Sequence, residues 1–310
     1  MSLTTIDWLG FRTKSPTATS IQAIKAAFGE KGEHVQAKAR KSGWQGYTHS
    51  ADLSLMGIHI GLIAFGGDNQ KGWSRLDLSS SGCKWVDDWQ QAQHAFDNLA
   101  EYETRRIDIA LDTFNREVTH EKVVEAYRNG LFASSGKPPA MTRIEPENRY
   151  DGSTVYVGKR TSDKFLRGYT KGYEMVRQFP NETISHINGV PIDDIYRLEL
   201  EIKAKMSAIP LDVIENRDGY FAGAYPYLQT VIEAAPLPFK PARSLAAQTS
   251  LEAALANIRR QYGNTLFTAL AAYGGDVGAL MDRVIGKEHN AALVAAGVLT
   301  TEHDGIGFTH

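Results

Sequence analysis

Hydrophobic and polar residues alternate along many short segments of this chain, a pattern that predicts β-strands. A helical period appears in fewer places, mostly between predicted strands. Strands are predicted over 5–11, 46–53, 58–65, 73–79, 105–114, 153–174 and 196–203. Helices are predicted over 18–29, over 86–99 and from an N-cap at Thr119 to about residue 132, with a loop over 134–148 and a turn at Asn188-Gly189. Because several neighbouring strands are spaced like hairpins, we expect an α+β fold with a mostly antiparallel central sheet and flanking helices.

The composition changes beyond residue 235. Residues 235–242 (APLPFKPA) carry three prolines, and the chain that follows is rich in alanine and leucine at helical spacing. We therefore expect three parts: a catalytic domain over 1–234, a proline-rich linker over 235–243 and a small helical C-terminal domain over 244–310. DNA binding, dimerisation and capping of the sheet are the open roles for that last part.

Composition and charge limit the class of protein. The chain has 310 residues, 42% hydrophobic and 23% charged, which is ordinary for a globular protein. The formal net charge of −2 means that any contact with nucleic acid must come from local basic patches. The single cysteine, Cys83, excludes an intramolecular disulfide, and there is neither a signal-peptide pattern nor an apolar run long enough to span a membrane. We expect a cytoplasmic protein that does not contact a membrane.

Three of the predicted strands carry the candidate chemistry. In 105–114 (RRIDIALDTF), Asp108 and Asp112 lie on the face opposite the aliphatic residues. In 196–203 (YRLELEIK), Glu199 and Glu201 share a face. The third segment, 153–174, alternates small residues with a set of cations and tyrosines, namely Arg167, Tyr169, Lys171 and Tyr173. One sheet surface could thus present four carboxylates, a tyrosine and two cations, which are the requirements of metal-assisted phosphoryl transfer to a tyrosine.

These segments resemble the rolling-circle replication initiation factors of the Rep_trans type, a family of plasmid and filamentous-phage initiators with related relaxases. Its R-[hydrophobic]-D-x-A-x-D strand is matched by Arg106, Asp108, Ala110 and Asp112. Its long Y-[FV]-G-x-R-x-S-D-x-[FY]-x-R-x-Y-x-K-x-x-E motif is matched by Tyr156, Gly158, Arg160, Ser162, Asp163, Phe165, Arg167, Tyr169, Lys171 and Glu174. Its R-x-E-[hydrophobic]-E-[hydrophobic]-K strand is matched by Arg197, Glu199, Glu201 and Lys203. The resemblance covers roughly residues 5–205.

The resemblance implies an enzyme that nicks one DNA strand at an origin. Tyr169 would attack the phosphate, remain joined to the 5′ end and leave a free 3′-OH primer, and the reaction could be reversed by religation. The acidic positions of the two flanking strands would bind the metal. None of the nine histidines lies two residues from another, so the His-hydrophobic-His metal motif of many other nickases is missing, as expected for the carboxylate type.

The chemistry explains why these residue types occur together. Tyrosine has a pKa of about 10 and needs a nearby cation to become a nucleophile at neutral pH. Mg²⁺ or Mn²⁺ prefers oxygen ligands, and the candidates are Asp108, Glu199 and Glu201, with Asp112 next. Lys171 and Arg167 would stabilise the charge of the attacked phosphate. The candidate DNA-binding residues are Arg106, Lys159, Arg160, Lys164 and Arg197.

Several alternatives remain open at the sequence level. A relaxase for conjugative transfer would use the same site, and a non-catalytic origin-binding regulator could retain the fold. Tyr173 is a second candidate nucleophile, although a structural role is the simpler reading. The expected partner is DNA, with a host helicase and a second copy of the chain as further candidates.

Overall fold

The computed structural model describes residues 3–133, 138–148, 151–177, 179, 184–205, 209–237, 243–290 and 294. The chain divides into two compact units, residues 1–239 and 240–310. Among the described residues, the first unit contains every strand and the second contains only helices.

The strands have the following bounds: β1 Thr5–Thr13, β2 Val35–Ala39, β3 His49–Leu55, β4 Ile58–Phe65, β5 Ser74–Leu78, β6 Glu103–Thr113, β7 Met141–Ile144, β8 Thr154–Val157, β9 Lys164–Thr170, β10 His186–Ile187, β11 Val190–Pro191 and β12 Tyr196–Lys203. The α-helices are α1 Thr17–Ala27, α2 Ser80–Cys83, α3 Trp89–Asp97, α4 His120–Arg128, α5 Lys171–Val176, α6 Arg217–Ala224, α7 Pro226–Val231, α8 Arg243–Ala272 and α9 Val277–Val284. Short 3-10 turns are η1 Gly29–His34, η2 Asp68–Gln70, η4 Ile192–Asp194 and η5 Leu211–Val213.

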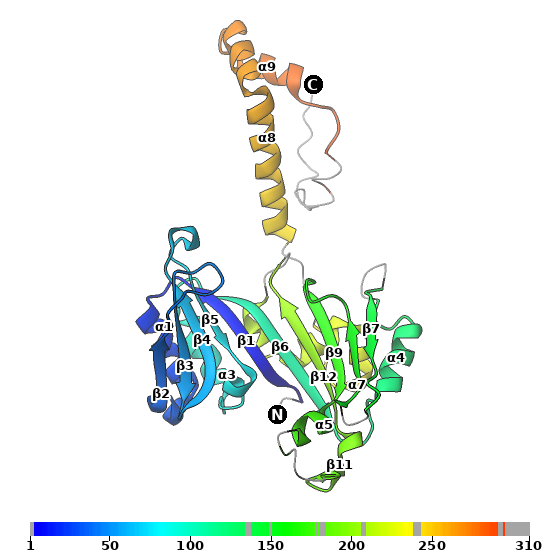
Figure 1. The fold of residues 1–310 in the computed structure, drawn as a ribbon. Helices are drawn as coiled ribbons and strands as arrows, with labels where there is room; N and C mark the ends of the chain where they lie inside the picture. Colours follow the sequence, from blue (N-terminus) through cyan, green and yellow to red (C-terminus); the bar gives the residue numbers. More distant parts are fainter. Residues whose placement is uncertain are drawn as a thin grey trace. The chain divides into compact units, whose positions relative to one another are not determined.

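One large sheet organises the first unit (Figure 1). Its strand order is β2-β3-β4-β5-β1-β6-β12-β9-β8-β7, and β10 and β11 form a separate hairpin. Every neighbouring pair is antiparallel. The predicted α+β fold with an antiparallel central sheet and flanking helices is therefore confirmed. The N-terminal strand β1 lies between β5 and β6, so residues distant in sequence become cross-strand neighbours.

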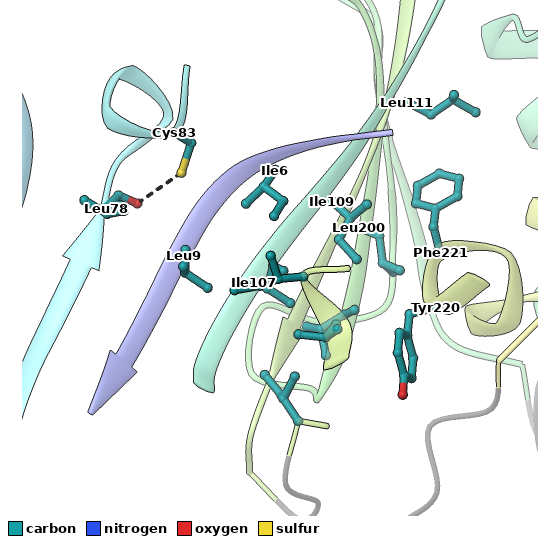
Figure 2. Packing of buried hydrophobic residues seen from close by; sticks show 14 of the residues in the cluster. Ile6, Leu9, Leu78, Cys83, Ile107, Ile109, Leu111, Leu200, Tyr220 and Phe221 are labelled. Carbon is teal, nitrogen blue, oxygen red and sulfur yellow. Dashed lines mark hydrogen bonds between the residues drawn. The ribbon is translucent and has the colours of Figure 1, made fainter. Parts of the chain in front are cut away.

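The hydrophobic core forms between one face of the sheet and the helices. Helices α1, α3, α4, α6 and α7 all contribute fully buried or nearly buried side chains to it. Figure 2 shows Ile109 and Leu200 of the sheet facing Phe221 and Tyr220 of α6. Removing a fully buried aromatic such as Phe221 would cost about 3–5 kcal/mol, so this layer fixes the strands that carry the opposite, polar face.

Most predicted elements of the first unit are present, whereas α6 and α7 were not predicted and others differ as follows. Strand β2 was not predicted: its sequence VQAKA alternates apolar and polar residues, but the segment is short, and all its residues except Val35 are exposed. The predicted loop over 134–148 is wrong in part, since it contains the edge strand β7 at 141–144. The helix that begins after the Thr119 N-cap ends at Arg128 rather than near residue 132.

The predicted single strand over 153–174 is wrong, and the difference matters for the site. Strands β8 and β9 form a hairpin around Gly158, whose φ of +93° is in the region that favours glycine. The strand then stops at Thr170 and α5 begins. A Cβ at Gly172 would lie 2.1 Å from the carbonyl oxygen of Ile192, so only glycine permits this close approach of α5 to η4.

The boundary of the first unit lies beyond the predicted one. The Leu237 amide donates to the Gly219 carbonyl (2.9 Å), so residues past 234 pack against α6. The linker residues 238–242 lie outside the described residues. In the second unit, α8 runs unbroken for 30 residues to Ala272, in agreement with the helical spacing of that part of the sequence. None of the helices in the described part of the chain is long and apolar enough to cross a membrane.

Candidate active site

The three predicted chemical strands lie side by side as β6, β12 and β9, and their register brings the candidate residues together. Asp108 of β6 is directly opposite Glu201 of β12, and Glu199 of β12 is opposite Arg167 of β9. Directly opposite residues have Cβ atoms about 4.5–5.5 Å apart and point to the same face. The polar face predicted from alternation therefore exists, and it is the face away from the hydrophobic core.

Tyr169 lies near the end of β9 beside an open cavity of about 210 Å³ that Tyr156, Arg167 and Thr154 also line. Its hydroxyl donates a hydrogen bond to Glu199 Oε2 at 3.3 Å. Burial raises the pKa of Tyr169 above its ordinary value, and this outweighs the opposing influence of the nearby Arg197 cation. At neutral pH the phenol is therefore protonated, and its hydroxyl is directed at the Glu199 carboxylate.

Arg167 lies between the carboxylates of Glu199 and Asp108. Its guanidinium forms an ion pair with Glu199 and lies 3.8 Å from Asp108 Oδ2. The Arg167 side chain is 25% exposed, whereas the Glu199 and Asp108 side chains are each 2% exposed. A ligand approaching this face meets the cation first, with the acids beneath it.

Lys171 begins helix α5 instead of continuing the strand as predicted. Its ammonium lies 2.5 Å from Glu174 Oε1 and 5.7 Å from the centroid of the Tyr169 ring. The cation is thus close to the tyrosine, but it approaches from the helix that follows the strand.

Tyr173 does not share the face of Tyr169, because the intervening residues are helical. Its side chain is buried, and its hydroxyl donates to Asp193 of η4. The shared face on which its role as a second nucleophile depended does not exist.

Asp108 and Glu201 are held by a single guanidinium. Arg106 donates two hydrogen bonds to Asp108 (2.8 and 2.6 Å), and the same terminal nitrogen lies 2.9 Å from Glu201 Oε2. Burial raises the pKa of Asp108 despite this partner, and the Glu201 charge adds to the effect. Glu201 Oε1 is buried and forms an ion pair with the Lys203 ammonium.

The oxygen atoms of these carboxylates are the type of ligand that a divalent cation prefers, but few carboxylates converge on one point. Among the described residues, no three His, Cys, Asp or Glu side chains are arranged to hold a metal ion together. Mg²⁺, however, is commonly held by one or two carboxylates and completed by water and substrate phosphate. The opposed pair Asp108 and Glu201 has the number and type of oxygen ligands that this smaller requirement asks for, although Arg106 and Lys203 pair with these carboxylates in the structure.

Asp112 is engaged elsewhere. It accepts two hydrogen bonds of 2.6 Å from Arg197, which also lies 3.0 Å from Asp7 of β1. Arg197 is only 7% exposed, so this predicted DNA-binding residue is covered by its two acidic partners. The arrangement joins β1, β6 and β12 and is separate from the Asp108–Glu201 pair.

The other predicted DNA-binding residues occupy different places. Arg106 is on the polar face, and Lys159 and Arg160 are exposed in the β8–β9 hairpin, where Arg160 lies over the rings of Tyr156 and Phe165. Lys164 is not brought to this face. It alternates with Arg167 along β9, and its ammonium donates to the Ala224 carbonyl (2.8 Å) at the end of α6.

Sequence reasoning missed two contributors. Tyr156 lines the same cavity as Tyr169, and its position opposite Arg167 was not recoverable without the β8–β9 register. Trp8 lies on the polar face opposite Asp108, with the Arg106 guanidinium 4.7 Å from its ring centroid. Alternation alone would place Trp8 on the core face with Ile6, and it is a register shift between these two residues that brings Trp8 to the polar face.

The match to a protein-family model agrees with the sequence resemblance. Residues 103–254 match the family model of the replication initiation factors, and this range includes all three motifs. Among solved structures, the chain is similar to a rolling-circle replication initiator protein from Geobacillus stearothermophilus, with 17% identity and a TM-score of 0.47 over 64% of this chain and 74% of that one. No curated protein matches the chain in sequence.

Proposed function

From the premise that residues 103–254 are those of a replication initiation factor, we propose that the chain nicks one DNA strand at its origin through Tyr169. The observation that carries the proposal is the hydrogen bond from the Tyr169 hydroxyl to the buried carboxylate of Glu199, beside an open cavity and an exposed guanidinium. The product would be a 5′-phosphotyrosyl link with a free 3′-OH, the primer from which rolling-circle synthesis starts.

The step balances as a transesterification. The Tyr169 oxygen forms a bond to phosphorus while the bond from phosphorus to the 3′ oxygen breaks. Glu199 accepts the phenol proton, and the leaving 3′ oxygen takes a proton from water. Because one phosphoester replaces another, a 3′-OH can reverse the reaction and religate the strand.

The cations near Tyr169 suit the charge that develops on the phosphate. The Arg167 guanidinium is held by Glu199, so its orientation is set before the substrate arrives. Lys171, close to the Tyr169 ring, adds a second positive charge from the other side of the strand end. Both residues would stabilise the transition state more than the ground state.

We further propose that Asp108 and Glu201 hold the divalent cation, Mg²⁺ or Mn²⁺, together with the substrate phosphate. A bound cation supplies Lewis-acid stabilisation of the scissile phosphate. Arg106 bridges the two carboxylates and Lys203 pairs with Glu201, so both cations would have to yield their positions. Glu199, engaged by Arg167 and Tyr169, then remains available as the proton acceptor.

The test is the formation of a covalent adduct. Single-stranded fragments of the protein's own replicon, incubated with the protein and Mg²⁺ or Mn²⁺, should give a protein–DNA species that survives denaturing electrophoresis. Peptide mapping should place the DNA on the peptide that contains Tyr169. Binding of these fragments without any adduct would instead favour the non-catalytic origin-binding reading.

A further inference from the structure

The polar face of the sheet continues from the candidate active site into the N-terminal strands, and the same local arrangement recurs along it. Arg75 of β5 donates two hydrogen bonds to Asp77, just as Arg106 does to Asp108 two strands away. The Arg75 side chain is 24% exposed and the Asp77 side chain 3% exposed. The carboxylate is therefore beneath the surface, and the guanidinium is what a ligand would touch.

The sequence of β1 is adapted to this arrangement. A Cβ at Gly10 would lie 2.3 Å from Asp77 Oδ1, so only glycine at this position leaves room for the carboxylate. The indole of Trp8 donates to the same oxygen at 3.2 Å. The buried acid is thus built into the sheet, and it fixes Arg75 in place.

Indole rings accompany the arginines on this face. The guanidinium of Arg106 lies 4.7 Å from the Trp8 ring centroid, that of Arg75 5.3 Å from Trp44, and that of Arg12 4.1 Å from Trp73. All three indoles are partly exposed. Three arginine–tryptophan pairs therefore come from one face of adjacent strands and their loops.

The placement of these cations has an electrostatic cost. Arg12 and Arg75 are directly opposite each other on β1 and β5. Like charges in that position destabilise a sheet unless something compensates for them. Glu103 and Asp77 each neutralise one of the two, but the arrangement would gain most from an anion lying across both.

We propose that these three pairs, which we name the Arg–Trp platform (Trp8, Arg12, Trp44, Trp73, Arg75 and Arg106), bind a single-stranded segment of DNA next to the nick site. Guanidinium groups contact phosphates, and unstacked bases stack on aromatic rings and guanidinium planes. Strands β9, β12, β6, β1 and β5 are consecutive, so the platform extends about 19 Å from Tyr169 across the sheet. This inference rests on the proposed function for the identity of the ligand as DNA.

The platform ends at a second cavity that extends it. This cavity, of about 600 Å³, is lined by Trp73 together with Lys14, Lys71 and the backbone of Gly66 and Gly67. The Lys14 ammonium lies 5.3 Å from the Trp73 ring centroid. A displaced base could enter beside Trp73 while its phosphate contacts the lysines.

The family match begins at residue 103, so most of the platform lies outside it. The platform therefore gives the N-terminal strands a role of their own, which is to hold the single strand while Tyr169 acts.

The test measures the affinity of the full chain for labelled oligothymidine of about 16 nucleotides, a probe with neither an origin nor a nick sequence. Trp44→Ala and Trp73→Ala should each weaken binding about tenfold. Arg12→Gln should reduce the slope of log affinity against log salt by about 0.7, the value for one phosphate contact on a single strand. Trp85 and Trp89 pack against the core, so most of the quenching of tryptophan fluorescence by the oligonucleotide should come from the platform.

The matched control is Lys31→Gln. Lys31 lies over Trp85 at 5.6 Å and pairs with Asp87, so it is a cation–indole pair remote from the platform. The affinity of the Lys31→Gln variant for oligothymidine, and the salt dependence of that affinity, should equal those of the wild type. Affinities of the two tryptophan variants within twofold of wild type, or an equal loss for duplex DNA, would overturn the proposal. Because oligothymidine binding needs no nicking, these outcomes are independent of whether Tyr169 forms an adduct.

Discussion

Replacement of two nearby tyrosines separates catalysis from stability. Tyr169→Phe removes a hydroxyl whose hydrogen bond to Glu199 is long, at 3.3 Å, and Glu199 keeps its ion pair with Arg167. The cost should be about 0.5–1 kcal/mol of unfolding free energy. Tyr173→Phe removes a hydroxyl that donates to the carboxylate of Asp193 from a buried side chain. Hydrogen bonds to charged groups are worth about 1.5–3 kcal/mol, so this variant should be the less stable one.

The magnitudes translate into measurable shifts. For a unit of this size, 1 kcal/mol corresponds to about 2–4 °C in Tm, so Tyr173→Phe should lower Tm by about 3–12 °C and Tyr169→Phe by about 1–4 °C. Calorimetry measures both. The adduct assay should show the opposite order: Tyr169→Phe forms no adduct but binds single-stranded DNA as the wild type does, and Tyr173→Phe forms the adduct below its Tm.

An adduct that persists in Tyr169→Phe or maps to Tyr173 would refute Tyr169 as the nucleophile. Loss of the adduct in a fully folded Tyr173→Phe variant would refute the purely structural role of Tyr173, since this residue would then act in the reaction through more than its hydrogen bond to Asp193.

Three further predictions concern the carboxylates and the second unit. Asp108→Asn and Glu201→Gln should each reduce nicking strongly and raise the Mn²⁺ concentration needed for half-maximal rate, and full nicking in EDTA would refute the metal proposal. Asp112→Asn should instead lower Tm, because it leaves the buried Arg197 with one acidic partner. Glu199→Gln should make the nicking rate rise about tenfold per pH unit between pH 7 and 9. The raised pKa of the Tyr169 phenol keeps it protonated in this range, and hydroxide must replace the Glu199 carboxylate as the proton acceptor. A nicking rate as independent of pH as that of the wild type would exclude Glu199 as the base. A chain ending at Phe239 should still form the adduct with single-stranded DNA, but it should lose its preference for its own duplex origin over unrelated duplex at matched salt. An unchanged preference would exclude the second unit as the element that recognises the origin.

The polar face around Tyr169 was predictable because strand alternation is a local property. Side chains two residues apart must share a face, so the positions of Asp108, Glu199 and Glu201 opposite an aliphatic face followed directly from their spacing. The bounds of β12 agree with the predicted segment 196–203 for the same reason. The family motifs added the expected order of the three segments along the chain, and the match to the family model covers all three segments.

The end of β9 was not predictable from alternation. Small residues alternate with large ones through Tyr173, and the pattern continues although the strand stops at Thr170. The helix forms there because glycine at position 172 lets the chain pack closely against Ile192, a contact between segments twenty residues apart. Tertiary packing therefore decided that Tyr169 and Tyr173 lie in different environments.

The partners of each charged group also required the tertiary structure. The sequence by itself determined which residues share a polar face, because that depends only on the backbone period. Only the sheet order decided that β1 lies between β5 and β6, so that Trp8 contacts Asp77 and Arg106, residues distant from it in sequence. Which arginine lies over which carboxylate or indole depends on strand register, and register results from the burial of the whole opposite face rather than from any one segment.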